Sequence, residues 1–273
     1  MFNIIIGEKL NSSVKKTFDA LNERNDDYLI RLIRYQEKCG ANHLDLNTAM
    51  CENEMEKMLY LTELTLNNSS CSVIIDTVDT NVIKEAAAYI NKKSAGYFII
   101  NSITVKQRID ELLPVINKYR CGVICLPILQ YGNVITADER LENAETLITR
   151  LTSEGVAKNN IYIDAVVDSL AMEEGSSLIT FSAIKKIKLK YPDVNVICGI
   201  SNSSYGLPER KNINAAFLTI AISCGLNGAI FDVTSEDMRS AMHASNALCG
   251  NDEYCMEYIN YIRNNKKELT LTV

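Results

Sequence analysis

Acidic and amide residues follow the apolar runs of this sequence at the points where those runs end. In VICGISNSSYG, residues 196–206, three apolar residues lead through Gly199 into Ser201 and Asn202. The polar residues that follow the other runs are Glu8, Asn11, Asp45, Asn47, Asp76, Asn101, Asp164 and Asp232. A carboxylate buried within an apolar run lowers the stability of the fold by several kcal/mol unless it is paired or takes part in binding or catalysis. One such Asp could cap a loop, but the whole set predicts a binding or catalytic site.

The chemistry of this set is that of carboxylates and carboxamides. It contains no histidine, no lysine run and no glycine-rich phosphate loop. A carboxylate accepts hydrogen bonds from two neighbouring N–H groups, and an Asn supplies one donor and one acceptor. These groups match a flat heterocycle with an amide-and-amine edge, such as a pterin. A phosphate ligand would instead favour glycine-rich turns or arginine.

Eight short apolar runs, most of them followed by a stretch with helical spacing, must position these side chains. The runs span residues 3–6, 43–47, 72–76, 96–101, 122–127, 161–165, 194–201 and 228–232. Their near-continuous apolarity is typical of strands covered on both faces, as in parallel sheets. Eight alternations of strand and helix predict an α/β fold, a (β/α)8 TIM barrel, in which the strand ends converge on one mouth. A doubly wound open sheet is the structural alternative.

The helical stretches and the linkers complete this prediction. Residues 14–40 read as one helical stretch that ends at Gly40, and Thr80 is a candidate cap for the helix after the third run. A further helix is expected at about residues 252–265. Because the chain has four prolines and no low-complexity linker, we expect one domain spanning residues 1–273.

Composition limits the classes of function. The 28 Lys+Arg against 34 Asp+Glu give a formal charge of −6, which argues against nonspecific nucleic-acid binding. No 18 apolar residues occur in a row, so we expect no membrane span. Nine cysteines without a CxxC pair, and only His43 and His243, give no zinc spacing. We expect no metal site, reduced thiols, and a cytoplasmic location.

Seven stretches of the sequence match one known family in order and spacing. They are IIGEKLN at 5–11, GANHLDLN at 40–47, IIDT at 74–77, INS at 100–102, YID at 162–164, GISNSSYGLPERKNIN at 199–214 and FLTIAISCGLNGAIFD at 217–232. With these stretches the chain resembles the methyltetrahydrofolate:corrinoid methyltransferases. That family belongs to the pterin-binding (β/α)8 barrels, which also include dihydropteroate synthase.

The resemblance implies roles for individual residues. Asp76, Asn101 and Asp164 match positions that hydrogen-bond the pterin ring, and Asn202 matches the catalytic residue at the nitrogen that carries the methyl group. Further matches at the mouth and around the ligand are Glu8, Asn11, Asp45, Asn47, Gly199, Ser201 and Arg210. Three positions depart from the family pattern: Lys9 replaces an arginine, Leu129-Gln130 replaces an Asn-Lys pair, and Tyr205 replaces a glutamine. These departures concern the corrinoid contacts and the direction of transfer.

The resemblance also implies substrates and partners. Tetrahydrofolate or methyltetrahydrofolate is the expected substrate, in anaerobic one-carbon or demethylation metabolism. No DxHxxG corrinoid signature occurs, so the corrinoid (cobalamin) is expected on a partner protein, and His43 is expected to be a satisfied strand-edge residue rather than a cobalt ligand. Family members are usually homodimers. Dihydropteroate synthase and a non-catalytic folate-binding subunit remain the alternatives.

Overall fold

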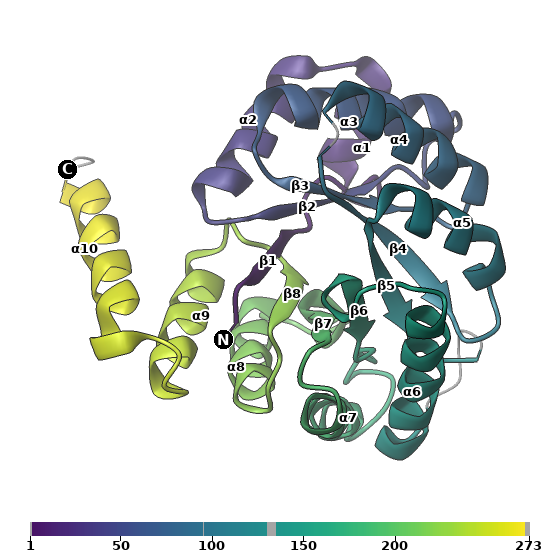
Figure 1. Cartoon of the computed structure of the whole chain (residues 1–273). Coiled ribbons are helices and arrows are strands. Elements are labelled where there is room, and N and C mark those ends of the chain that lie inside the picture. Colours follow the sequence, from purple (N-terminus) through teal and green to yellow (C-terminus); the bar gives the residue numbers. More distant parts are fainter. Residues whose placement is uncertain (1, 95, 130–134, 271–273) are drawn as a thin grey trace.

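Eight parallel strands close into a barrel in chain order, and helices cover its outer side (Figure 1). The computed structural model describes residues 2–94, 96–129 and 135–270. The strands are β1 Ile4–Gly7, β2 His43–Asn47, β3 Ser72–Asp76, β4 Phe98–Thr104, β5 Gly122–Leu126, β6 Ile161–Asp164, β7 Asn195–Gly199 and β8 Gly228–Phe231. The prediction of a (β/α)8 barrel is therefore confirmed, and the open doubly wound sheet is wrong.

The helices follow the strands in alternation, as the sequence pattern predicts. They are α1 Lys15–Glu23, α2 Asp26–Lys38, α3 Glu54–Asn68, α4 Thr80–Lys93, α5 Ile109–Tyr119, α6 Ala137–Ser153, α7 Ser176–Lys190, α8 Arg210–Ser223, α9 Glu236–Leu248 and α10 Met256–Thr270. Helix α10 packs against α9 and stands away from the rest of the barrel (Figure 1). Among the described helices, none combines the length and the hydropathy that a membrane crossing requires.

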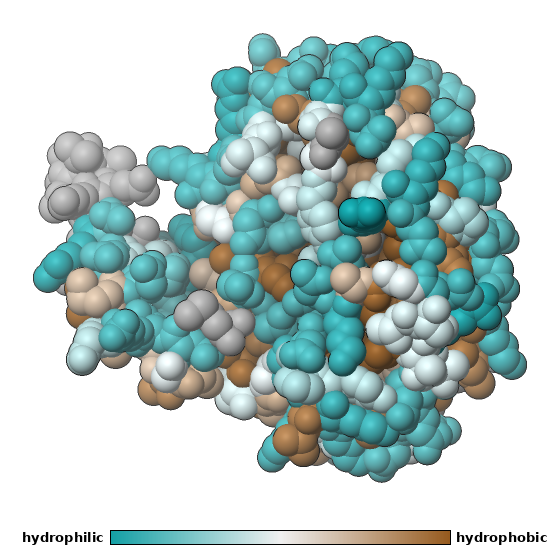
Figure 2. Space-filling model, in the orientation of Figure 1, coloured by the Kyte–Doolittle hydropathy of each residue, from teal (hydrophilic) through white to brown (hydrophobic). Residues whose placement is uncertain are grey.

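The core has two parts, one inside the barrel and one between the strands and the helices. The inner part consists of isoleucines and one tyrosine: Ile4, Ile6, Ile74, Ile99, Ile124, Tyr162 and Ile197. Residues of opposite parity on the same strands, such as Val73 and Ile75, pack outward against the helices. Because both faces of every strand are buried, the strands read as continuous apolar runs. In the view of Figure 2, hydrophobic residues show mainly in recesses between largely hydrophilic elements.

The alternation of side chains along a strand carries the polar residues to the mouth. Residues two positions apart point to the same side of a strand. On seven strands the inward positions lead, toward the carboxyl end, to Glu8, Asp45 and Asn47, Asp76, Asn101, Asp164, Gly199 and Asp232, whereas on β5 they lead to Leu126. The isoleucine layer thus forms the floor on which these polar residues lie.

Two helix boundaries differ from the sequence prediction. Residues 14–40 form two helices, because Arg24 adopts a left-handed conformation with φ of 52° and the Asn25 side chain caps α2 at the Tyr28 N–H. The cap of α4 is Asp79 rather than Thr80, since the Asp79 carboxylate accepts from the N–H groups of the second and third helical residues.

Two strands end more than one residue away from the ends of the predicted runs. Strand β4 continues beyond Asn101 to Thr104, with a shift of register against β5 between Asn101 and Ile103. Strand β7 stops at Gly199, and residues Ile200–Asn202 form a 3₁₀ turn. This turn moves Asn202 out of the strand and onto the rim of the mouth.

His43, at the start of β2, gives a test of the fold that is independent of function. Its Nδ1 lies 2.7 Å from Asn42 Oδ1, and burial lowers its pKa to about 4. Below pH 6.5 the unfolded chain therefore takes up a proton that folded His43 does not, so the stability falls. We expect the free energy of unfolding to decrease by about 1.5 kcal/mol more between pH 6.5 and 5 in the parent than in His43→Gln. Urea unfolding at both pH values measures this difference, and equal decreases would contradict it.

Candidate active site at the barrel mouth

Two carboxyl groups lie together on neighbouring strands at the mouth. Asp45 on β2 and Asp76 on β3 share a side-chain hydrogen bond. Burial, followed by the nearby charge of Asp76, raises the pKa of Asp45 well above its usual value. Burial also raises the pKa of Asp76, which its hydrogen bonds from Asn47 and Asp45 oppose. Because the pKa of each carboxyl is raised, the pair favours a state in which one proton lies between Asp45 and Asp76.

Two amides fix this carboxyl pair. The Asn47 Nδ2 donates to Asp76 Oδ2 at 2.7 Å, and the Asn101 Nδ2 lies 3.3 Å from Asp45 Oδ1. Asn47 is itself held by the hydroxyl of Ser12, which lies 3.3 Å from its Oδ1. Three adjacent strands thus supply one connected group of acceptors and donors, which the sequence predicted from their common position at strand ends.

Asp164, on β6, faces this group from another part of the barrel wall. Its Oδ1 accepts the N–H of Val166 at 2.8 Å, and burial raises its pKa to about 6. The hydrogen bond to Val166 and the charge of Arg140 oppose that rise. Asp164 is therefore largely ionised at neutral pH, although its charge is costly in that environment.

Glu8 and Ser201 connect the first and seventh strands across the mouth. The Ser201 hydroxyl lies 2.8 Å and 2.9 Å from the two carboxylate oxygens of Glu8. Burial raises the pKa of Glu8, and the bond from Ser201 opposes the rise. Next to them, Lys9 forms an ion pair of 2.8 Å with Asp232 at the end of β8. The carboxylates of β1 and β8 are thus already partnered by protein groups.

Asn202 differs from these residues because its side chain is exposed and has no hydrogen-bond partner among the residues that the structure describes. It lies against Gly199: a Cβ at position 199 would be 3.2 Å from the Asn202 Nδ2. The absence of a side chain at Gly199 therefore leaves room for the Asn202 amide. Its donor and acceptor remain available to a ligand.

Arg210 and Asn11 shape loops beside the site. The guanidinium of Arg210 reaches from α8 to the β7 turn, where it donates to the Ser201 carbonyl at 2.6 Å and to the Ser204 hydroxyl at 3.0 Å. Asn11 Oδ1 accepts the N–H of Ser13 at 2.8 Å, and its backbone forms an isolated bridge with Asn47. Both residues thus hold strand-end segments in place. Of the Leu129-Gln130 pair, Gln130 lies outside the described residues, and Leu129 is exposed.

Sequence reasoning missed two arginines next to the site. Arg108 donates to the Thr77 carbonyl at 2.8 Å, and its charge acts on Asp76. Arg140 is buried on α6. The signal for Arg140 was present in the sequence: it occupies the apolar stripe of α6, followed at positions i+4, i+7, i+8 and i+11 by Ala144, Leu147, Ile148 and Leu151. A charge on a buried stripe is a candidate for a specific role.

The arrangement fits a flat, polar heterocycle. Acceptors at Asp76 and Asp164 and amides at Asn101 and Asn202 surround an inner layer of isoleucines, so ring N–H groups would find partners and ring faces would find apolar surface. The described residues hold no group of three or more His, Cys, Asp or Glu side chains placed to bind a metal ion.

The comparison with known families decides which class of enzyme this is. Residues 7–232 match the model of the pterin binding enzymes. The chain belongs to this family. It is 29% identical over 267 residues to the methylcorrinoid:tetrahydrofolate methyltransferase of Eubacterium limosum, a match that covers 96% of this chain and 97% of that protein. It is 26% identical over 242 residues to the methionine synthase of Mycobacterium tuberculosis, where the match covers 83% of this chain and 20% of that protein.

Solved structures support the same fold. A dihydropteroate synthase from Xanthomonas albilineans, in complex with 7,8-dihydropteroate, superposes with a TM-score of 0.69 at 15% identity over 90% of this chain and 94% of that one. The dihydropteroate synthase from Yersinia pestis superposes with a TM-score of 0.68 at 18% identity, over 89% of this chain and 92% of that one. At these identities the likeness shows the fold alone.

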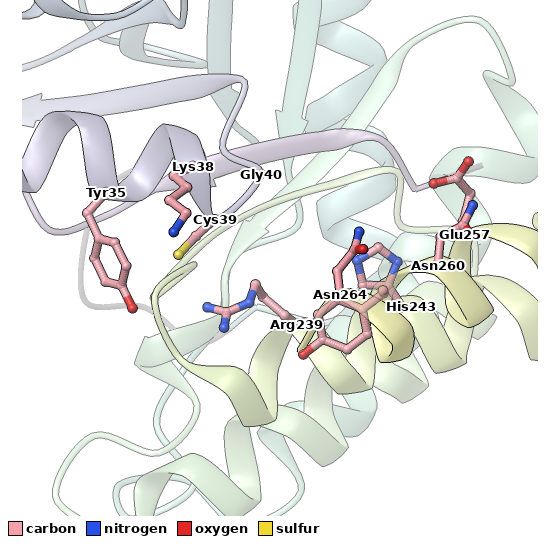
Figure 3. A pocket seen from close by; sticks show the side chains of 10 residues that line it. Tyr35, Lys38, Cys39, Gly40, Arg239, His243, Glu257, Asn260 and Asn264 are labelled. Carbon is pink, nitrogen blue, oxygen red and sulfur yellow. The ribbon is translucent and has the colours of Figure 1, made fainter. Parts of the chain in front are cut away.

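This pterin-binding enzyme also has a pocket of about 590 Å³ away from the mouth, between the end of α2 and helices α9 and α10 (Figure 3). It is lined in part by Arg239, His243 and Tyr261, and the His243 and Tyr261 rings stack with centroids 4.4 Å apart. None of the strand-end residues lines this pocket. The mouth, where the polar residues of seven strands meet, is therefore the candidate active site.

Proposed function

We propose that this enzyme moves a methyl group between the cobalt of a corrinoid protein and the ring nitrogen of tetrahydrofolate. The observation that carries the proposal is the match, over almost the full length of both chains, to the methylcorrinoid:tetrahydrofolate methyltransferase. The chemistry of the mouth supports it, because the mouth offers acceptors and amides suited to a pterin ring.

Asp76, Asn101 and Asp164 would hold the pterin. Asp76 is bonded to Asn47 at Oδ2 and shares a hydrogen bond with Asp45, and Asp164 is bonded to Val166 at Oδ1. Since a carboxylate has about four lone-pair sites, each can still accept from ring N–H groups. Asp45 would keep Asp76 oriented through the shared proton. These contacts fix the ring in the plane from which its nitrogen meets the methyl group, and such alignment contributes several kcal/mol to the rate.

Asn202 would act at the nitrogen that carries the methyl group. When the nitrogen of tetrahydrofolate attacks the methyl carbon, a bond forms from nitrogen to carbon, the bond from carbon to the cobalt of the corrinoid substrate breaks with its electron pair left on that substrate, and the proton of the nitrogen passes to solvent water. In reverse, nitrogen takes up a proton as the methyl departs. An uncharged amide can donate to the nitrogen or accept from its N–H, and so stabilise the charge that develops.

The corrinoid protein would dock on the rim of the mouth. Six exposed hydrophobic side chains lie in the loops that follow β1, β2, β3, β5, β6 and β7: Val14, Met50, Val78, Leu129, Met172 and Tyr205. Exposed apolar residues around a polar depression are typical of protein interaction sites. The corrinoid supplies the cobalt that gives or accepts the methyl, and this chain supplies the folate site.

We further propose a cytoplasmic homodimer, in line with the family resemblance.

Dihydropteroate synthase chemistry finds less support at this mouth. That reaction releases pyrophosphate and calls for free cationic groups. Here Lys9 is paired with Asp232, and Arg210 is bonded to the turn after β7. The cations nearest the strand ends therefore have protein partners.

The decisive experiment mixes the enzyme with tetrahydrofolate and a methylated corrinoid protein, and follows the cobalt absorbance and the formation of methyltetrahydrofolate. We expect demethylation of the corrinoid that depends on both enzyme and folate. The reverse mixture, with methyltetrahydrofolate and reduced corrinoid protein, tests the other direction. Folate binding without transfer in either direction would establish the non-catalytic alternative instead.

Gly199→Ala tests the contact between β7 and Asn202. The added methyl would lie 3.2 Å from the Asn202 Nδ2, so we expect it to displace that amide. Transfer should slow about 10-fold, as misplacing one catalytic group does, while the melting temperature stays near the parent value. Steady-state kinetics and thermal unfolding of the same preparation measure both. Parental kinetics would show that the amide position does not matter.

A further inference from the structure

Arg140 is a charged side chain with no exposure to solvent, on the face of α6 that packs against the barrel. Its Nη1 donates to the carbonyl of Ala165 at 2.7 Å and to the carbonyl of Val166, and lies 3.3 Å from the hydroxyl of Thr180. Its Nη2 donates to the Asp168 carboxylate at 2.6 Å. All of these partners lie on the loop after β6 or on α7. Arg140 therefore ties α6 to the segment that follows Asp164.

Stability alone does not account for this residue. Arg140 is fully buried while Asp168 is half-buried, and burying a charge removes hydration that the attraction within an ion pair often fails to recover, so an apolar pair of similar volume is frequently as stable. The Nε of Arg140 is buried without a hydrogen-bond partner in the described part of the chain. The position lies on an otherwise apolar stripe, which a Leu or Met would fill.

The peptide of Val166 is the target of these contacts. Val166 has φ of 58°, a left-handed conformation that β-branched residues strongly disfavour. Its N–H donates to Asp164 Oδ1 at 2.8 Å, while its carbonyl accepts from Arg140 and, at 2.9 Å, from Thr180. The two ends of one residue are thus bound to the functional carboxylate on one side and to the buried cation on the other.

We propose that Arg140 is a positioning residue for the pterin site, which holds Val166 in its left-handed conformation and thereby fixes the orientation of the Asp164 carboxylate. This inference rests on the proposed function, since it assumes that Asp164 binds the folate ring. It extends that function by one step, from the residues at the mouth to a cation behind the barrel wall.

The charge of Arg140 has a second consequence. Arg140 on α6 is the ionisable group whose charge acts on Asp164, and the Cys198 thiol on β7 is in turn affected by the charge of Asp164. Burial raises the pKa of the Cys198 thiol well above its usual value, so it stays uncharged at neutral pH. Arg140 is then the cation that favours the ionised form of Asp164.

The test uses variants that remove the charge without leaving an unpaired ion in the core. In the double variant Arg140→Met with Asp168→Leu, both partners become apolar, so the fold should persist. Arg140→Lys keeps the charge but lacks the planar fork that reaches several acceptors. Arg150→Met, on the exposed side of the same helix, is the matched control.

Calorimetric titration with tetrahydrofolate gives the readout. We expect the double variant to bind about 10- to 100-fold more weakly, Arg140→Lys to lie between it and the parent, and Arg150→Met to bind like the parent. The pH below which binding is lost should rise in the double variant, because Asp164 then lacks its neighbouring cation. A purely structural role would move the melting temperature but not this pH profile.

The outcomes separate the inference from the function on which it rests. A parent enzyme that does not bind tetrahydrofolate overturns the proposed function. Tight binding by the parent, with equal affinity and an equal pH profile in the folded variants, overturns the positioning role alone. Should the double variant not fold, Arg140→Lys decides, since it keeps the charge but loses the planar fork, and parental affinity for tetrahydrofolate there contradicts the proposal.

Discussion

Asn202→Ala is expected to slow methyl transfer by about 10²-fold or more, the scale on which the loss of one oriented hydrogen-bond donor acts. The Asn202 amide is exposed at the mouth and has no hydrogen-bond partner in the described part of the chain, so its removal costs the fold little. The affinity for tetrahydrofolate should change much less than the rate, because the interaction strengthens only as charge develops on the nitrogen. Single-turnover kinetics and calorimetric titration measure the two quantities separately.

The control for this variant is Asn91→Ala, which removes an exposed amide near the end of α4 that lies away from the mouth. It should leave rate and affinity at parental values. If Asn202→Ala transfers the methyl group as fast as the parent, the amide is not at the reacting nitrogen. A large loss of affinity with an unchanged rate would instead make Asn202 a binding residue.

The barrel and the candidate site could be predicted from the sequence for the same reason. In a barrel, strand ends converge, so the positions of Asp76, Asn101 and Asp164 after apolar runs were enough to bring them to one mouth. The alternation of side chains along each strand directs these residues into the barrel, because a residue two positions after an inward-pointing isoleucine also points inward. Nothing in this reasoning required knowledge of how the helices pack.

Other features of the site could not be predicted from the sequence, mainly because they depend on contacts between distant segments. The proton shared by Asp45 and Asp76 requires that two neighbouring strands bring their carboxyl groups into contact. The pair of Glu8 and Ser201 joins residues 193 positions apart. The break between α1 and α2 at Arg24 could not be predicted for a different reason: it is a local left-handed conformation inside a continuous helical pattern.

Asp164→Asn should separate stability from binding. The folded-state pKa of Asp164 is raised from 3.8 to about 6, so the ionised form is disfavoured in the fold. The resulting penalty on stability is full above pH 6 and fades as pH falls toward 3.8, because the folded protein then takes up the proton first. The neutral amide avoids it, and we expect the free energy of unfolding at pH 7.5 to rise by about 1–3 kcal/mol. The difference from the parent should shrink toward pH 4.

The same substitution should weaken tetrahydrofolate binding by about 10- to 100-fold at pH 7.5, because an amide presents its NH₂ where the carboxylate would accept a second N–H. Parental affinity should itself fall below pH 6, while the affinity of the variant stays flat. Asp193→Asn, an exposed carboxylate before β7, is the control and should change neither quantity. A variant that gains stability but binds folate as tightly as the parent would remove Asp164 from the site. A variant that loses both would show that the carboxylate mainly holds the Val166 turn.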